Sequence, residues 1–244
     1  MQLIIYQLGL IEYFEAYALQ RKLLHQRLQG EIPDTVLLLE HPPTFTIGKS
    51  GKIENILISK EELFEEGISL FIVNRGGDVT YHGPGQLVGY PILDLRNRGR
   101  DVHRYMYDLE EVLLKTINSF SIEAYRDTSH AGVWVKGEEV AALGLSIHKW
   151  ISMHGFALNV HTKLNHFSLI NPCGFLDRRA TSISKLLNRK VSVTEVADIL
   201  INKFAEVFDA QIENGSGLIS RRYFQDNAMP LYGDLDRRLC NGYL

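Results

Sequence analysis

The residues best suited to chemistry in this sequence lie in one glycine-rich segment and around one cysteine. The segment runs from Arg75 to Gln86 and reads Arg-Gly-Gly-Asp-Val-Thr-Tyr-His-Gly-Pro-Gly-Gln. Glycine is favoured where the backbone needs φ > 0 or must approach a ligand closely. An ordinary turn has no use for so many polar side chains. The segment therefore predicts a loop between two strands that holds a ligand close to its backbone.

Cys173 is the candidate nucleophile. It stands between Pro172 and Gly174, where rigid loop backbone can turn a thiol toward a cleft. Buried structural cysteine is the commoner situation, so Cys173 alone is weak evidence. Polar context comes from His82, from His154 and from Thr181-Ser182. Metal binding is the weaker interpretation, because the sequence has no His-x-x-His, His-Glu-x-x-His or Cys-x-x-Cys spacing.

Strands and helices in alternation must position these residues. Hydrophobic patterns predict strands at 3–8, 35–39, 44–47, 69–73, 87–93, 132–135, 139–147 and 151–160, and helices at 11–28, 60–66, 102–119 and 193–208. Ser59 with Glu62 and Ser192 with Glu195 form capping signals at two helix starts. Residues 166–187 are expected to be irregular. Joins of hairpin length predict an α/β or α+β fold with a mixed, largely antiparallel sheet and flanking helices.

Composition limits the partners and the compartment. The 244 residues carry a formal net charge of −3, which gives no bulk attraction for nucleic acid or an anionic membrane. Cys173 and Cys240 form no disulfide framework, and no apolar run reaches the length of a membrane span. We expect a soluble cytoplasmic protein with no nucleic-acid or membrane partner. One large domain is expected over residues 1–214, followed by a polar extension over 215–244.

Several motifs together resemble those of a known family. The Arg75–Gln86 segment is similar to the signature of the lipoyl(octanoyl) transferases. Further matches are Glu40–Gly48, Ala141–Gly144, His154–Asn159, Asn171–Gly174 and Thr181-Ser182, in the family's order over roughly residues 3–210. The resemblance implies the catalytic-domain fold of the biotin and lipoate protein ligases. It implies no cofactor.

The same resemblance implies a two-step acyl transfer. The Cys173 thiolate would take octanoyl from octanoyl-acyl carrier protein as a thioester and pass it to a lysine of a lipoyl domain. The acceptors would be the lipoyl domains of 2-oxoacid dehydrogenases and the glycine cleavage H protein. The implied acyl site is lined by Arg75, Gly76, Gly77, Asp78, Val79, Thr80, Tyr81, His82, Ala142, Leu143, Gly144, Gly155, Phe156 and Ala157. A basic cluster after the cysteine either docks the acidic carrier or is a solvated face; it comprises Arg178, Arg179, Lys185, Arg189 and Lys190.

One position departs from the family pattern. Where the family has a lysine near the cysteine, this sequence has Glu139. A carboxylate beside a thiol would raise the thiol's pKa, whereas an ammonium would lower it. If Gly137-Glu138 is a two-residue hairpin turn, Lys136 and Glu139 close it and Lys136 could supply the cation. Alternatively, Lys136 only pairs with Glu139 at the surface, Glu139 accepts the proton of the incoming amine, or His154 partners the thiol.

These observations leave two other functions open. An ATP-dependent lipoate or biotin ligase is disfavoured, because such enzymes activate the acid as an adenylate and need no cysteine nucleophile. A non-catalytic homologue that holds acyl groups or a carrier domain has Glu139 as its main support. We expect an acyltransferase with Cys173, Glu139 and His154 as its candidate catalytic residues.

Overall fold

The computed structural model describes residues 1–127, 131–171 and 179–215. Its strands are β1 (Gln2–Leu10), β2 (Asp34–Glu40), β3 (Thr44–Ile47), β4 (Ser69–Ile72), β5 (Val79–His82), β6 (Gln86–Ile92), β7 (Tyr125–Arg126), β8 (Gly132–Val135), β9 (Glu138–His148), β10 (Ile151–Asn159) and β11 (Gln211–Asn214). Its α-helices are α1 (Tyr13–Gln29), α2 (Lys60–Glu65), α3 (Val102–Asn118), α4 (Ile183–Leu187) and α5 (Val193–Phe208). Short 3-10 helices are η1 (Ile53–Asn55), η2 (Leu95–Asn97) and η3 (Leu164–Leu169).

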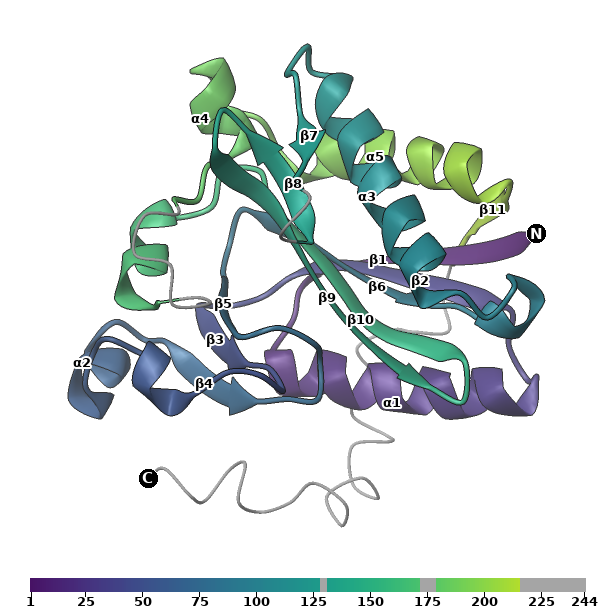
Figure 1. Cartoon of the computed structure of the whole chain (residues 1–244), viewed down its shortest axis with the longest axis horizontal. Coiled ribbons are helices and arrows are strands. Elements are labelled where there is room, and N and C mark those ends of the chain that lie inside the picture. The colour runs from purple at the N-terminus through teal and green to yellow at the C-terminus, as the bar shows by residue number, and fades with distance from the viewer. Residues whose placement is uncertain (128–130, 172–178, 216–244) are drawn as a thin grey trace.

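In the described residues an 8-stranded sheet has the order β11-β1-β2-β6-β10-β9-β8-β7 (Figure 1). The pairs β1–β11 and β1–β2 are parallel, and every other pair of the sheet is antiparallel. The expected mixed, largely antiparallel sheet with flanking helices is confirmed. None of the helices in these residues is long and apolar enough to cross a membrane.

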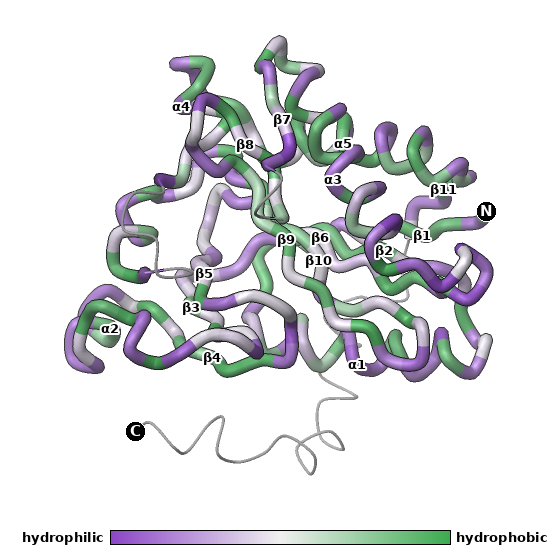
Figure 2. Tube along the Cα trace, in the orientation of Figure 1, coloured by the Kyte–Doolittle hydropathy of each residue, from purple (hydrophilic) through white to green (hydrophobic). Residues whose placement is uncertain are grey.

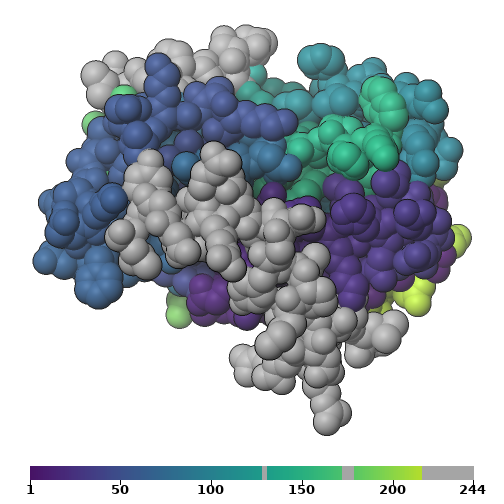
Figure 3. All heavy atoms as spheres, turned by 90° about the horizontal axis from the view of Figure 1, so that it is seen from below, coloured from purple at the N-terminus to yellow at the C-terminus, as the bar shows by residue number. Residues whose placement is uncertain are grey.

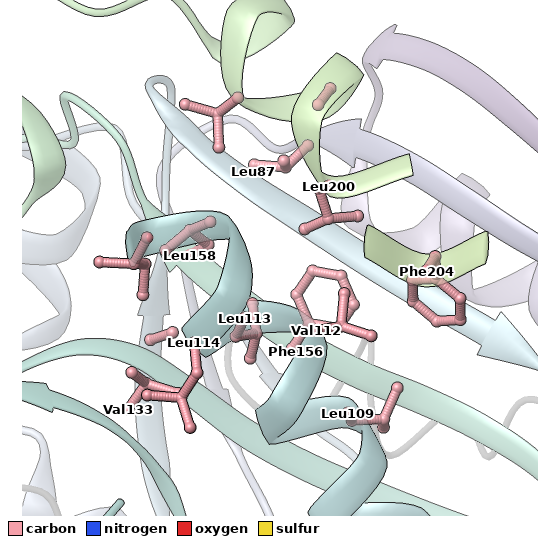
Figure 4. Packing of buried hydrophobic residues seen from close by; sticks show 14 of the residues in the cluster. Leu87, Leu109, Val112, Leu113, Leu114, Val133, Phe156, Leu158, Leu200 and Phe204 are labelled. Carbon is pink, nitrogen blue, oxygen red and sulfur yellow. The ribbon is translucent and has the colours of Figure 1, made fainter. Parts of the chain in front are cut away.

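The two faces of this sheet are covered by different helices. Val36 and Leu38 of β2 pack in the core beneath α3 and α5, whereas Leu37 and Leu39 pack against α1. This is the two-residue period of a strand that is buried on both faces. Figure 4 shows the first core, where Leu113 of α3 and Leu200 of α5 lie close to strand side chains. Along α5, hydrophobic and hydrophilic segments alternate in Figure 2, as expected for a helix with one face on the core.

A second, 3-stranded sheet of order β4-β3-β5 forms a lobe with α2 and η3. β3 pairs parallel to β4 and antiparallel to β5. Figure 3 shows the region of β3, α2 and β4, in blue, beside the purple α1. The rings of Tyr13 in α1 and Phe71 in β4 stack at 5.1 Å. The lobe therefore lies beside the N-terminal end of α1.

Most predicted elements are confirmed within two residues at each end, and two details are wrong. Residues 75–86 are not one loop, because Val79–His82 pairs with β3 as strand β5. The expected irregular stretch 166–187 ends in helix α4, where the side chain of Ser182 accepts a hydrogen bond from the backbone of Lys185. The expected extension 215–244 lies outside the described residues from position 216 onward.

Candidate active site

An inner cavity of about 50 Å³ lies where β9 and β10 face β5, β6 and α1. It is lined by Tyr13, Arg75, Thr80, His82, Tyr90, Ala142, Leu143, Gly144, His154, Gly155, Phe156 and Ala157. Gly144 and Gly155 pair across β9 and β10. A Cβ on Gly155 would overlap the carbonyl oxygen of Gly89, so that position requires glycine. The small residues of the two strands leave an apolar track that suits a methylene chain.

Arg75 ties the start of the glycine-rich segment to the neighbouring strand. Its guanidinium is buried and donates to Thr46 O (2.7 Å), Asp78 O (2.7 Å) and Gly76 O (2.9 Å), as well as to Thr46 Oγ1. A Cβ on Gly144 would lie 3.1 Å from Arg75 Cδ, so the glycine makes room for this side chain. In these contacts Arg75 holds backbone carbonyls in place and shapes the wall of the cavity.

Asp78 faces away from the inner cavity toward η1. Its carboxylate accepts two hydrogen bonds from Asn55 Nδ2 (2.8 and 2.7 Å) and one from the backbone of Val79. Asn55 O in turn accepts from the backbone N–H of Asn171 at 2.8 Å. The Asn171–Gly174 motif is thus anchored at its first residue. Cys173 lies outside the described residues.

The hydrogen bonds around His82 determine its tautomer. Gln86 Nε2 donates to Tyr81 O and to Asn159 Oδ1, each at 3.0 Å, so Gln86 Oε1 faces the histidine. Because this oxygen only accepts, His82 Nδ1 must carry the proton of the 2.9 Å contact. Burial holds the pKa of His82 well below its usual value. The cavity is therefore lined by a neutral imidazole whose Nε2 can accept a hydrogen bond.

His154 lies in β10 with a left-handed backbone of φ 58, which is unusual for a non-glycine residue. Its N–H donates to Gln20 Oε1 (2.9 Å), and its Nε2 lies 2.8 Å from Asn74 Oδ1. The ring is 2% exposed and contacts the rings of Tyr17 and Tyr90. Burial lowers the pKa of His154 to about 3, with Arg75 acting in the same direction. His154 is therefore a neutral wall residue of the cavity.

Three residues of this site were not predicted from the sequence. Tyr13 and Tyr90 line the cavity, and His41 stands behind them with Nε2 2.8 Å from Tyr90 Oη. His41 Nδ1 faces Ile11 O, which only accepts, so Nδ1 carries the proton and Tyr90 donates to Nε2. The sequence pattern of the helix expected at 11–28 places Phe14, Tyr17, Ala18, Leu24 and Leu28 near one face, which does not include Tyr13. The face that α1 buries comprises Tyr13, Ala16, Leu19, Gln20, Leu23 and Leu24.

The proposed pairing of Lys136 with Glu139 is wrong. The hairpin turn is Lys136-Gly137, with φ of 50 and 83, and it places β8 Val135 opposite Glu138. Positive φ at both turn residues matches the twist of the flanking strands. Lys136 is exposed in the turn, while Glu139 pairs with Trp134 one step further along the hairpin. Glu139 N donates to Arg179 O at 2.9 Å, and Thr181 N donates to Glu139 O at 2.8 Å.

Acidic residues compensate part of the basic cluster after the cysteine. Lys185 Nζ lies 3.1 Å from Glu138, and Arg189 Nη2 lies 3.4 Å from Glu195. Arg178 lies outside the described residues, and Arg179 is exposed. Both acidic partners lie outside the stretch from Arg178 to Lys190, so the sequence around the cluster did not show them. These exposed pairs weaken the case for the cluster as a docking surface.

Some of the predicted site residues line the inner cavity, and others lie elsewhere. The structure brings Arg75, Thr80, His82, His154, the run Ala142–Gly144 and the run Gly155–Ala157 around one cavity. Gly76 and Gly77 lie in the backbone turn of the glycine-rich segment, where Gly76 N donates to Leu145 O at 2.7 Å. The side chains of Val79 and Tyr81 pack in the core of the small sheet.

Burial of His41 predicts a loss of stability in acid. Burial lowers the pKa of His41 to about 4 from 6.5, although the Ile11 hydrogen bond opposes this shift. The unfolded chain therefore binds the proton first, and folding stability falls as pH drops from 6.5 toward 4. We expect His41→Gln to reduce the slope of unfolding free energy against pH in this window by about 1.4 kcal/mol per pH unit. Urea titrations at a series of pH values measure that slope.

His25, which is exposed on α1, provides the matched control for this measurement. His25→Gln should leave the slope as it is in the parent chain. An equal change of slope in both variants, or none in His41→Gln, would contradict the assignment of a buried neutral imidazole at position 41.

Comparisons with known proteins give consistent results. The family model described as the lipoyl protein ligase A/B catalytic domain matches residues 12–205. An octanoyltransferase of Caldicellulosiruptor saccharolyticus is 51% identical over 213 residues, covering 86% of this chain and 91% of the relative. An octanoyltransferase of Desulforamulus reducens is 43% identical, covering 87% and 94%. Among solved structures, the bi-partite lipoate protein ligase of Thermoplasma acidophilum has a TM-score of 0.75 at 15% identity, covering 100% of this chain and 98% of that chain.

Proposed function

This chain belongs to the lipoyl protein ligase A/B catalytic domain family, and we propose that it transfers octanoyl from an acyl-carrier thioester to a lipoyl-domain lysine through Cys173. It is an acyltransferase that acts in protein lipoylation. The observation that carries this function is the 51% identity to an octanoyltransferase over nearly the whole length of both chains. The covalent intermediate and the identity of donor and acceptor are the proposed parts.

The proposed reaction has two steps that each exchange one bond at the acyl carbon. The Cys173 thiolate attacks the carbonyl of the donor thioester, a new C–S bond forms, the C–S bond to the carrier breaks, and the carrier leaves as its thiolate. The lysine ε-amine of the acceptor then attacks, a C–N bond forms, and the Cys173 thiolate leaves while the amine gives up a proton. Two attacks on an activated carbonyl replace one slow aminolysis.

The inner cavity supports this proposal through its shape and polarity. Ala142, Gly144 and Gly155 present backbone and small side chains, so that methylene groups of an acyl chain can lie against the sheet. The imidazole of His82 is neutral in this cavity, and so is that of His154. No charged imidazole therefore has to be desolvated by an apolar chain. Glu139 is proposed as the acceptor of the amine proton.

A donor comparison tests the proposed function. The full chain is incubated with a lipoyl domain and either octanoyl-acyl carrier protein or octanoate with ATP, and the acceptor is weighed by mass spectrometry. We expect octanoylation with the carrier thioester and none with octanoate and ATP. A lipoyl domain whose target lysine is replaced by arginine is the control acceptor and should stay unmodified. Transfer that requires ATP would support a ligase instead, and binding without transfer would support a non-catalytic role.

A further inference from the structure

A second, outer cavity lies directly beyond one wall of the inner cavity. Its volume is about 510 Å³, and it is lined by Tyr17, Ile47, Gly48, Lys49, Gly51, Ile53, Ile72, Val73 and Asn74. His154 lines the inner cavity and Asn74 lines the outer one. His154 Nε2 and Asn74 Oδ1 are 2.8 Å apart. One hydrogen-bonded pair of side chains therefore separates the two spaces.

The local structure holds this pair in place. The backbone of His154 has φ 58, and Gln20 Oε1, fully buried on α1, accepts its N–H at 2.9 Å. The Tyr17 ring lies 5.7 Å from the imidazole on the side of the outer cavity. Left-handed backbone within a strand is costly for a side-chain-bearing residue, so the imidazole is kept in the wall against a local preference.

Tyr13 and Tyr90, two further large side chains that line the inner cavity, have packed protein behind them. The Tyr90 hydroxyl donates to His41, and the Tyr13 ring packs on Phe71, His41 and His82. Beyond Tyr90 lies the buried cluster between α1 and the large sheet. Within the part of the chain that the structure describes, space for further atoms opens behind His154.

The outer cavity suits additional methylene groups. Ile47, Ile53, Ile72 and Val73 give it apolar walls, and Ile72 is 43% exposed. Each methylene that moves from water to such a surface gains hydrophobic free energy. A chain longer than the inner cavity would be held there if the wall were absent.

We propose that His154, held by Asn74, is the residue that limits acyl-chain length in this enzyme. The inference rests on the proposed octanoyl transfer and adds its specificity determinant. With the imidazole in place, the inner cavity ends at His154. Without it, the inner and outer cavities become one channel, and acyl groups of ten or twelve carbons become substrates.

The test compares acyl donors of different length in a His154→Gly variant. Glycine adopts φ 58 without strain, so this substitution opens the wall without disturbing the backbone of β10. Values of kcat/KM are measured with octanoyl- and decanoyl-acyl carrier protein. The decanoyl ratio is kcat/KM for the decanoyl donor divided by kcat/KM for the octanoyl donor. We expect it to rise by at least about tenfold over that of the parent chain. His148→Gly, an exposed histidine at the end of β9, is the control and should keep the parent ratio.

Two further variants test the wall and the cavity separately. Asn74→Ala removes the hydrogen-bond partner at an exposed position and should raise the decanoyl ratio by a smaller factor. Adding Ile72→Trp to His154→Gly refills the outer cavity and should return the ratio toward that of the parent. If His154→Gly does not fold, Asn74→Ala decides the question.

The outcomes are distinguishable from failure of the proposed function. A parent chain that transfers no octanoyl group refutes the proposed function. If the parent chain transfers octanoyl but the decanoyl ratio is unchanged in the His154 and Asn74 variants, the proposed role of His154 in limiting chain length is refuted and the proposed function is not. A ratio that rises in His154→Gly but is insensitive to Ile72→Trp would show that longer chains take another route.

Discussion

Replacing Cys173 with alanine is expected to lower octanoyl transfer by at least about 10³-fold, because the variant lacks the nucleophile on which both steps depend. Initial rates with octanoyl-acyl carrier protein and a lipoyl domain measure this loss. Intact-mass spectra without the acceptor give a second readout. The parent chain should gain one octanoyl group that hydroxylamine removes, as a thioester requires. The variant should gain none.

Cys240→Ala is the matched control, since Cys240 is the other cysteine of the chain. We expect it to transfer at the parent rate and to acquire the adduct. Transfer by Cys173→Ala at a rate near that of the parent would exclude the covalent route and favour direct attack of the amine on the carrier thioester. An adduct that survives in Cys173→Ala but disappears in Cys240→Ala would move the nucleophile to the other cysteine.

Local signals predicted the elements of this fold well. The capping box of Ser59 and Glu62 and the N-cap of Ser192 place two helix starts correctly. These caps are predictable because each satisfies the backbone N–H groups of its own first turn. The strands were recognisable for a similar reason, since apolar runs such as that of β2 are buried on both sides. Sequence therefore suffices where the cause of a structure lies within a few residues.

The features that the sequence did not predict depend on contacts between segments far apart in the chain. The glycines of residues 75–86 concealed β5, whose backbone partners lie in β3. The Lys136-Gly137 turn puts a non-glycine residue, Lys136, at positive φ, and the strand register fixes this rather than residue preference. Tyr13, His41 and Tyr90 come from three separate segments of the chain, and no short motif unites them. The motifs did predict the cavity residues on β5, β9 and β10, because there the small residues themselves create the space.

Glu139→Gln is expected to slow transfer to the lipoyl lysine by about 10²-fold while leaving acylation of Cys173 intact. The amide has the size of the carboxylate but cannot take the proton of the incoming amine. The two backbone hydrogen bonds of Glu139, to Arg179 O and from Thr181 N, do not involve its side chain and should survive. Single-turnover rates from the isolated octanoyl-enzyme to the acceptor separate this step from the first. Glu138→Gln, which loses only the exposed Lys185 pair, is the control.

The Glu139→Lys variant tests whether the carboxylate of Glu139 assists octanoyl transfer or slows it. Lysine restores the family residue, whose ammonium would lower the pKa of a neighbouring thiol and whose neutral form could accept the amine proton. We expect this variant to exceed Glu139→Gln by about 10²-fold and so to stay near the parent rate. A gain of more than tenfold over the parent would instead show that Glu139 depresses the reactivity of the thiol. Equal rates for Gln, Lys and the parent would assign the proton to another group, and His82 would be tested next because its Nε2 is the unprotonated nitrogen in the inner cavity.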